Sequence, residues 1–167
     1  MPSQANIIKQ RVKNVIFEVH KNTYMKLSIG GDHAGFQLKL KFVEKLKYLG
    51  HEVDDFGPYS EDSCDYPDFA HQVAGGVQNK THDLGIVICG SGNGVNMVAN
   101  KYQDVRSALC WDTELAFMAK AHNNANVLAI PARYISEEKA FEILNEFLNT
   151  PFEGGRHEKR VNKISCG

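Results

Sequence analysis

The sequence has no long apolar run: no stretch of its 167 residues approaches the roughly 18 consecutive apolar residues of a membrane-spanning helix. A transmembrane segment is therefore excluded, and no membrane partner is expected. Neither sign of charge predominates, since the sequence has 19 Lys and Arg against 20 Asp and Glu. A nucleic-acid-binding face neutralises phosphates with clustered Lys and Arg, so a net charge of -1 argues against a nucleic-acid partner.

Cysteine is sparse and scattered. The four cysteines, Cys64, Cys89, Cys110 and Cys166, include no C-x-x-C pair, so they form neither a zinc-ligand pattern nor a disulfide framework. No metal site is therefore expected. Because the sequence shows no export signal, we expect a reducing, cytoplasmic location in which the thiols stay free.

A hydrophobic content of 43% fits one globular domain, because a chain of this length buries about 70% of its unfolded surface without disulfides or metals. The charge is uneven, however. Residues 1–24 carry a net charge of +3, from Lys9, Arg11, Lys13 and Lys21 against Glu18, which leaves -4 for residues 25–167. We therefore expect an N-terminal extension, residues 1–24, and a single domain, residues 25–167.

The N-terminal extension has its own pattern. Its apolar residues between Ile7 and Val19 recur at steps of three and four, which is typical of a short amphipathic helix. We favour an additional segment, or an upstream start codon before a natural start at Met25. A targeting presequence is the alternative, although the segment lacks the Arg and Ser richness of a transit peptide.

From Met25 onward, short apolar runs alternate with amphipathic segments. Strands are predicted at residues 26–30, 51–56, 84–89, 106–111 and 126–130, and helices at 36–49, 67–77, from the Gly90–Gly94 loop to about 102, 113–121 and 136–149. The first of these helices has Phe42 and Leu46 on its apolar face, and Lys39 is expected away from that face. Five β-α units in order predict an α/β fold: a Rossmann-like three-layer sandwich whose five-stranded parallel sheet is doubly wound in flavodoxin-like order.

Cys89 ends the most apolar strand, and Gly90-Ser91-Gly92-Asn93-Gly94 follows it. Three glycines let the backbone approach a ligand closely, and a helix that starts there offers free N–H groups to a phosphate or a reaction oxyanion. Such a site favours the thiolate of Cys89 as a base or nucleophile. The alternative is that Cys89 is a small buried residue beside a tight turn. The loop is neither a P-loop nor G-x-G-x-x-G with a later ribose carboxylate, which disfavours ATP and NAD.

Other polar residues have two interpretations each. Asp32 and His33 stand side by side between glycines. If Asp32 is a helix N-cap and His33 lies on the surface, a structural role accounts for one of the two residues but not for both. His122 ends a predicted helix, where a structural role is the simpler reading. Arg156 and Arg160, four residues apart, form either a solvated basic face or a phosphate clamp.

Five motifs together resemble one family. The sequence contains, in this order, GGDHAGFQLK, DYPDFA, ICGSGNGVNMVANK, AKAHNNANVLAI and EGGRHEKRV. Their order and spacing resemble those of type B ribose-5-phosphate isomerases, the family that also includes galactose-6-phosphate isomerase subunits. The resemblance runs from about Met25 to Ile164. It implies a Rossmann-like sandwich that works as a homodimer or tetramer, with no metal or organic cofactor.

The resemblance also implies a role for each matching residue. Cys89 matches the cysteine that moves a proton between C1 and C2, and Val95 holds the position where another branch of the family uses a glutamate. Asp32 and His122 match residues that open the furanose ring, and Ser91 matches the hydroxyl that contacts the sugar oxygens. Further implied substrate contacts are His33, Tyr66, Asn123, Arg133, Arg156 and Arg160, with His33 and the arginines on the phosphate. The segment of His122 and Asn123 is expected to reach the site from a neighbouring subunit.

The expected reaction interconverts D-ribose 5-phosphate and D-ribulose 5-phosphate through ring opening and a cis-enediolate, with Cys89 as the base. The backbone of Gly90, Gly92, Asn93 and Gly94 is expected to stabilise the negative charge of that intermediate. Within the family, the alternative substrate is a hexose 6-phosphate such as allose or galactose 6-phosphate. Outside it, the alternatives are a catalytically silent sugar-phosphate-binding protein and an FMN binder of similar architecture.

Overall fold

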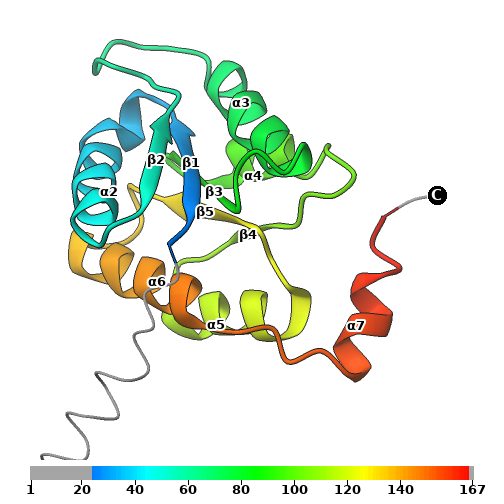
Figure 1. The fold of residues 1–167 in the computed structure, drawn as a ribbon. Helices are drawn as coiled ribbons and strands as arrows, with labels where there is room; N and C mark the ends of the chain where they lie inside the picture. The colour runs from blue at the N-terminus through cyan, green and yellow to red at the C-terminus, as the bar shows by residue number, and fades with distance from the viewer. Residues whose placement is uncertain (1–23, 166–167) are drawn as a thin grey trace, which may run out of the picture.

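The computed structural model describes residues 24–165 as a parallel β-sheet between two layers of helices (Figure 1). The strands are β1 (Lys26–Gly31), β2 (Glu52–Asp55), β3 (Leu84–Cys89), β4 (Ser107–Leu109) and β5 (Val127–Pro131). The helix predicted between Ile7 and Val19 lies outside the described residues. Among residues 24–165, no helix combines the length and apolar character needed to cross a bilayer.

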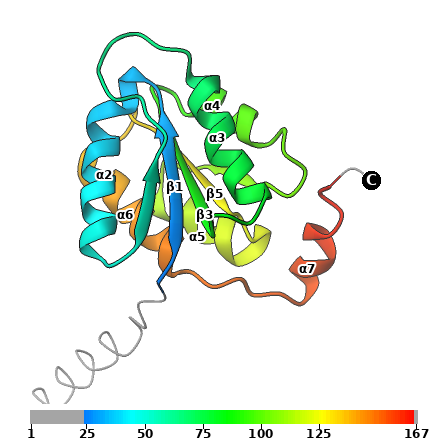
Figure 2. The same ribbon diagram turned by 45° about the horizontal axis from the view of Figure 1, so that its top comes forward.

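The helices cover both faces of the sheet, as Figure 2 shows. One layer holds α2 (Phe36–Tyr48), α5 (Thr113–Asn123) and α6 (Glu137–Asn149), and the other holds α3 (Tyr66–Gln78) and α4 (Asn93–Ala99). A short 3-10 helix, η1 (His33–Gly35), joins β1 to α2, and α7 (Arg156–Val161) packs beside α5. The predicted three-layer α/β architecture with a parallel five-stranded sheet is confirmed.

The strand order is β2-β1-β3-β5-β4, so the last two strands are exchanged relative to the flavodoxin order 2-1-3-4-5. Every residue of β5 is buried, whereas all three residues of β4 are only partly buried. The more apolar strand thus takes the interior position, and the shorter strand takes the edge. Because crossovers between parallel strands are right-handed, the return from β4 to β5 places α5 on the face that α2 covers.

The centre of the core is β3, whose six residues are all buried. Ile86 and Ile88 pack in the cluster under α2, α5 and α6, while Val87 and Cys89 pack in the cluster under α3 and α4. Alternate side chains therefore leave opposite faces of the strand, as predicted for a strand buried on both sides. As the last residue of β3, Cys89 lies at the carboxyl edge of the sheet.

The expectation that Lys39 lies away from the apolar face was wrong. Its side chain is completely buried and pairs with the carboxylate of Asp55 at the end of β2. Its Nζ atom also lies 5.7 Å from the ring centroid of Phe36 and 5.5 Å from that of Tyr59. The second oxygen of Asp55 accepts the N–H of Gly57 at 2.9 Å. Helical periodicity cannot identify this lysine, because its partner comes from a strand distant in sequence.

We expect Asp55→Ala to lower the free energy of unfolding by about 3 kcal/mol, because it leaves a buried ammonium group without a counter-charge. The double variant Lys39→Met, Asp55→Ala removes both charges and should recover part of that loss. Urea denaturation followed by circular dichroism measures both values. As a control, Glu137→Ala breaks the exposed pair with Lys41 and should cost less than about 1 kcal/mol. A double variant less stable than Asp55→Ala would contradict this account.

Candidate active site

The loops that follow β1 and β3 meet at the carboxyl edge of the sheet. The N–H of Asp32 donates to the carbonyl oxygen of Ile88 at 3.0 Å, which joins the first loop to the end of β3. A Cβ atom at Gly31 would overlap that same carbonyl oxygen. The absence of a side chain at Gly31 therefore allows the approach that brings Asp32 and His33 to the level of Cys89.

Cys89 is almost completely buried, at 4% exposure, and its Sγ accepts the N–H of Gly92 at 3.0 Å. Gly92 has a φ angle of 73°, and a Cβ atom there would overlap Leu109, so the donor is positioned by a conformation that glycine alone adopts freely. A backbone N–H directed at sulfur stabilises negative charge on that atom. These surroundings fit a thiol that exchanges a proton better than one that only fills space.

The two other described cysteines have different surroundings. Burial raises the pKa of Cys110 to about 12, and its thiol donates to the carbonyl oxygen of Ala108 at 3.6 Å. Burial is also the main cause that raises the pKa of Cys64, although a hydrogen bond from the backbone of His33 opposes it. Both thiols therefore stay protonated near neutral pH.

Asp32 is the N-cap residue that the sequence allowed, and one of its carboxylate oxygens is not used by the cap. Its Oδ1 accepts the N–H of Gly35 at 3.0 Å and caps η1, while its Oδ2 has no hydrogen-bond partner among residues 24–165. The neighbouring His33 has a buried Nδ1 that also lacks a partner within those residues. A buried polar atom without a partner is costly, and an oxygen of a bound anion would satisfy it.

Gly90 and Gly94 make room for two larger side chains. A Cβ atom at Gly90 would lie 3.3 Å from Cδ of Arg133, whose N–H donates to the carbonyl oxygen of Gly90 at 3.1 Å. A Cβ atom at Gly94 would lie 2.5 Å from the ring of Tyr66. The glycine-rich loop therefore has Arg133 and Tyr66 packed against its backbone.

A cavity of about 570 Å³ adjoins this loop. Its lining joins Ser91 and Asn93 to side chains near the ends of β4 and β5: Leu109, Trp111, Pro131, Tyr134 and Ile135. Trp111 and Tyr134 are 55% and 75% exposed. The sequence places Trp111 in the loop after a predicted strand, but neither residue was given a role in the site. An aromatic residue soon after a predicted strand is the sequence signal that would have found them.

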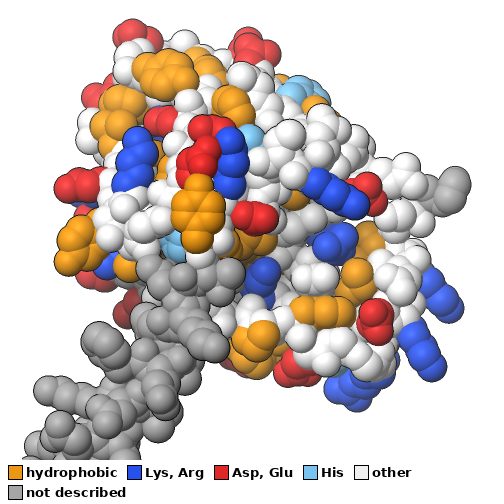
Figure 3. Space-filling view, viewed as in Figure 1, with side chains coloured by type: hydrophobic (Ala, Val, Ile, Leu, Met, Phe, Trp, Pro, Cys, Tyr) orange, Lys and Arg blue, Asp and Glu red, His pale blue; other side chains and the backbone are white. Residues whose placement is uncertain are grey.

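The remaining predicted residues lie at the opposite, amino edge of the sheet. α5 runs from the end of β4 to the start of β5 and extends to Asn123, beyond its predicted end, so His122 and Asn123 lie in its last turn. Arg156 and Arg160 are exposed on α7, which packs beside α5 (Figure 1). Figure 3 shows Lys and Arg side chains gathered over this part of the surface. One chain therefore does not bring these four residues together with the Cys89 loop.

His122 belongs to a compact cluster with His157 and Glu153. The two imidazole rings stack with centroids 4.1 Å apart, and Oε2 of Glu153 lies 3.6 Å from Nε2 of each ring. The three ligand atoms lie within 4.8 Å of one another, a spacing that a metal ion can bridge. However, Nε–H of Arg156 donates to Nε2 of His157 at 3.4 Å, and its positive charge opposes a cation. The pKa of His157 is lowered by burial and then by the charges of His122 and Arg156, which favours the neutral form of this ring.

The sequence model of the ribose/galactose isomerase family matches residues 27–164. The chain belongs to the ribose/galactose isomerase family. Ribose-5-phosphate isomerase B of Escherichia coli is 41% identical over 141 residues, which cover 84% of this chain and 95% of that protein. The probable ribose-5-phosphate isomerase B of Mycoplasma genitalium is 45% identical over 138 residues, or 81% of this chain and 91% of the relative.

Solved structures of ribose/galactose isomerases share the fold. The ribose 5-phosphate isomerase of Thermotoga maritima is 48% identical, with a TM-score of 0.82 over 84% of this chain and 97% of that one. The Mycoplasma genitalium ribose-5-phosphate isomerase B, solved with bound ribulose-5-phosphate, is 43% identical, with a TM-score of 0.80 over 83% and 93% of the two chains. The family predicted from five motifs is confirmed.

The contact between Gly94 and Tyr66 predicts that the effect of Gly94→Ala on stability changes sign when the Tyr66 ring is removed. Gly94→Ala should destabilise the isomerase by about 1 kcal/mol or more, because its Cβ overlaps the Tyr66 ring. In a Tyr66→Ala background the overlap is gone, and the same change in α4 should stabilise by a few tenths of a kcal/mol through helix propensity. Thermal unfolding measures all four variants. If the effects of the two substitutions on stability were additive, the position of the Tyr66 ring would not require a glycine at residue 94.

Proposed function

We propose that this chain is an aldose-ketose isomerase that interconverts D-ribose 5-phosphate and D-ribulose 5-phosphate, a step of the non-oxidative pentose phosphate pathway. The proposal rests above all on Cys89, a buried thiol whose Sγ receives the N–H of Gly92 at 3.0 Å. Asp32, His33 and Arg133 lie at the same edge of the sheet. Similarity to ribose-5-phosphate isomerases B, one of them solved with ribulose-5-phosphate, supports the substrate.

Ring opening comes first, because ribose 5-phosphate is mostly a closed furanose. One group must protonate the ring oxygen while another removes the proton of the C1 hydroxyl. Asp32 contributes Oδ2, which has no partner among the described residues, and His122 contributes the second group. Glu153, 3.6 Å from Nε2 of His122, holds that ring in place.

Proton transfer follows on the open-chain aldose. The thiolate of Cys89 removes the proton from C2, and the electron pair of that bond forms the C1–C2 double bond of a cis-enediolate, with negative charge on O1. Ser91 and the N–H groups of the loop that follows Cys89 stabilise this charge. The hydroxyl proton of O2 moves to O1, and Cys89 returns its proton to C1 to give the ketose. The scheme balances with protons alone, so it requires no cofactor.

Hydrogen-bond donors from two groups hold the phosphate of the substrate. At the carboxyl edge, His33 offers Nδ1, which has no partner among the described residues, and Arg133 lies against Gly90. At the amino edge, Arg156 and Arg160 are exposed on α7. Binding a dianion far from C1 and C2 supplies energy that orients the reacting carbons.

We infer a homodimer, because the proposed site is incomplete within one chain. β4 is an open edge of the sheet, and an apolar groove of about 380 Å³ lies against it. The side chains that line this groove include Leu109, Leu115, Met118 and Ile164, together with Asn123. A second copy related by two-fold symmetry would cover both grooves and bring the His122 end of each chain to the Cys89 loop of the other. A tetramer would add nothing that this site lacks.

Two further expectations belong to the proposal. Residues 25–167 form the isomerase domain and residues 1–24 an extension that the reaction does not use, which the family match to residues 27–164 supports. The cytoplasm is the proposed compartment, because Cys89 acts as a base only as a free thiol, and a reducing environment keeps it so.

The alternatives have less support. A hexose 6-phosphate isomerase would use the same chemistry, but the named relatives act on ribose 5-phosphate. A silent sugar-phosphate-binding protein would need the arginines but not a buried thiol that receives a backbone N–H.

We expect Cys89→Ala to abolish isomerisation, because no other group in the scheme removes the C2 proton, while the fold and phosphate binding persist. Formation of ribulose 5-phosphate measures activity, and calorimetric titration with inorganic phosphate measures binding. Cys110→Ala is the matched control and should remain active, because the thiol of Cys110 stays protonated. A Cys89→Ala enzyme with most of its activity would remove Cys89 from the role of base.

Mixing two inactive variants tests the shared site. Cys89→Ala and His122→Asn should each be inactive alone, because every site lacks one of the two groups. After unfolding and refolding together, half of the dimers combine both variants, and one of their two sites holds Cys89 and His122. Activity should recover to about a quarter of the unmodified level. No recovery, despite mixed dimers seen by native mass spectrometry, would place His122 in the site of its own chain.

A further inference from the structure

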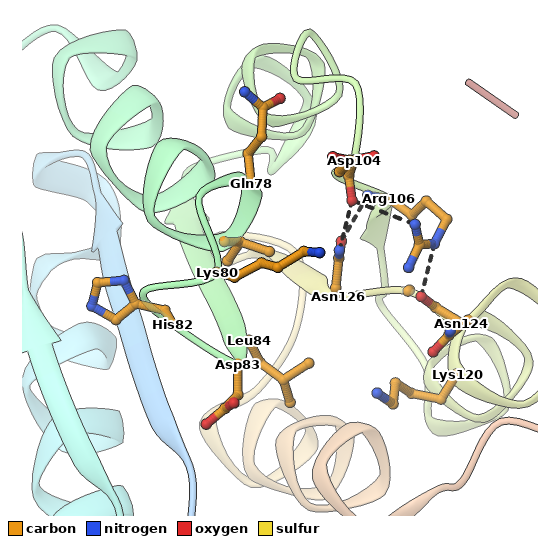
Figure 4. A pocket seen from close by; sticks show the side chains of 12 residues that line it. Gln78, Lys80, His82, Asp83, Leu84, Asp104, Arg106, Lys120, Asn124 and Asn126 are labelled. Carbon is orange, nitrogen blue, oxygen red and sulfur yellow. Dashed lines mark hydrogen bonds between the residues drawn. The ribbon is translucent and has the colours of Figure 1, made fainter. Parts of the chain in front are cut away.

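A second cavity lies at the amino edge of the sheet, the edge opposite the Cys89 loop. Its volume is about 650 Å³, within the range of small-molecule sites. The loop after α3, the segment before β4, the end of α5 and the start of β5 surround it (Figure 4). The proposed isomerase reaction uses none of its lining residues.

Three cationic side chains from separate segments line this cavity: Lys80, Arg106 and Lys120. Figure 4 shows the ammonium groups of Lys80 and Lys120 turned toward its interior. None of the three forms an ion pair within residues 24–165. His82, which also lines the cavity, is already paired with Asp54 at 2.9 Å.

Two of these cations, Arg106 and Lys120, are partly buried, and their charges repel each other. Burial lowers the pKa of Lys120, and the charge of Arg106 lowers it further. Burial also lowers the pKa of Arg106, with a partly opposing effect of Asp104. Both charges would gain from a bound anion, because an opposite charge compensates for lost solvation and for their mutual repulsion.

Two carboxylates border the cavity without pairing with its cations. Oδ2 of Asp83 accepts the N–H of Lys26 at 2.7 Å. Asp104 is exposed, and only its backbone oxygen accepts hydrogen bonds from the lining, from Arg106 at 3.4 Å and from Asn126 at 2.8 Å. Three cations against these two carboxylates leave a net charge of +1 on the lining.

The guanidinium of Arg106 is held in place without a ligand. Its Nε–H donates to the carbonyl oxygen of Asn124 at 2.9 Å, and its backbone N–H donates to Oδ1 of Asn126 at 2.7 Å. Nζ of Lys120 likewise lies 5.2 Å from the ring centroid of Phe147. Side chains already fixed in this way lose little conformational entropy when an anion binds.

We propose that this cavity binds a small phosphorylated metabolite through Lys80, Arg106 and Lys120. A phosphate dianion offers several acceptor oxygens to ammonium and guanidinium groups, and this cavity is lined by both. The N-terminal segment, residues 1–24, has the wrong charge to be the occupant, because its net charge is +3. The proposal does not depend on the isomerase reaction.

Calorimetric titration of the full chain with inorganic pyrophosphate tests the proposal. Arg133→Ala serves as the background, because it weakens anion binding at the proposed active site. In that background we expect Lys120→Met to weaken pyrophosphate binding about tenfold, since it removes one charge and keeps an apolar side chain over Phe147. Lys80→Asn should weaken binding similarly, and Asn tolerates the φ angle of 59° at this position.

Lys45→Met is the matched control, because Lys45 lies 5.8 Å from the ring centroid of Tyr48 but outside the cavity. It should leave the affinity unchanged. Pyrophosphate should also slow the acetylation of Lys120 by acetic anhydride, followed by mass spectrometry, and should not slow that of Lys45. Unchanged affinity in both Lys120→Met and Lys80→Asn would overturn the proposal, as would loss of all pyrophosphate binding in Arg133→Ala alone.

Discussion

The geometry of the candidate active site depends on the close contact between the ends of β1 and β3. The carbonyl oxygen of Ile88 leaves no room for a Cβ atom at Gly31 and accepts the N–H of Asp32 at 3.0 Å. From these two neighbouring strands the chain turns to opposite faces, to α2 after β1 and to α4 after β3. A reversal of this kind leaves a crevice between the two departing loops, and ligands bind there in doubly wound sheets. Cys89 lies at that crevice because β3 ends there.

The exchange of β4 and β5 connects the packing of the sheet to the assembly of the site. The fully buried β5 takes the interior position, and β4, only partly buried, becomes the edge. An exposed edge strand is prone to pair with other chains unless it is covered. In this chain the apolar groove beside β4 also includes Asn123, from the turn that holds His122. The strand arrangement that hides the most apolar residues thus leaves open the surface that the proposed dimer needs.

Local sequence patterns predicted most of the fold, because alternation and helical periodicity report burial within a few residues. The bounds of β3 coincide with the apolar run at 84–89, and the motifs located Cys89, Asp32 and their loops. What local patterns could not supply were relations between distant segments. The order of β4 and β5 follows from competition for the interior of the sheet, and the burial of Lys39 in α2 follows from a carboxylate at the end of β2. The expectation that His122 serves a neighbouring subunit likewise came from the family resemblance and not from a local pattern, and within one chain the fold places this residue at the other edge of the sheet.

Few of the described cations are paired within the chain. Lys26, Lys39, Lys41 and Lys139 form ion pairs with carboxylates, whereas the other lysines and all the arginines among residues 24–165 form none. Those arginines are Arg106, Arg133, Arg156 and Arg160. A planar guanidinium group binds phosphate through two parallel hydrogen bonds, a geometry that an ammonium group lacks. Three of the four belong to the proposed active site, and the fourth lines the cavity at the amino edge. Because none of the four forms an ion pair among the described residues, the same physical argument that supports a phosphate in the proposed active site supports one in that cavity.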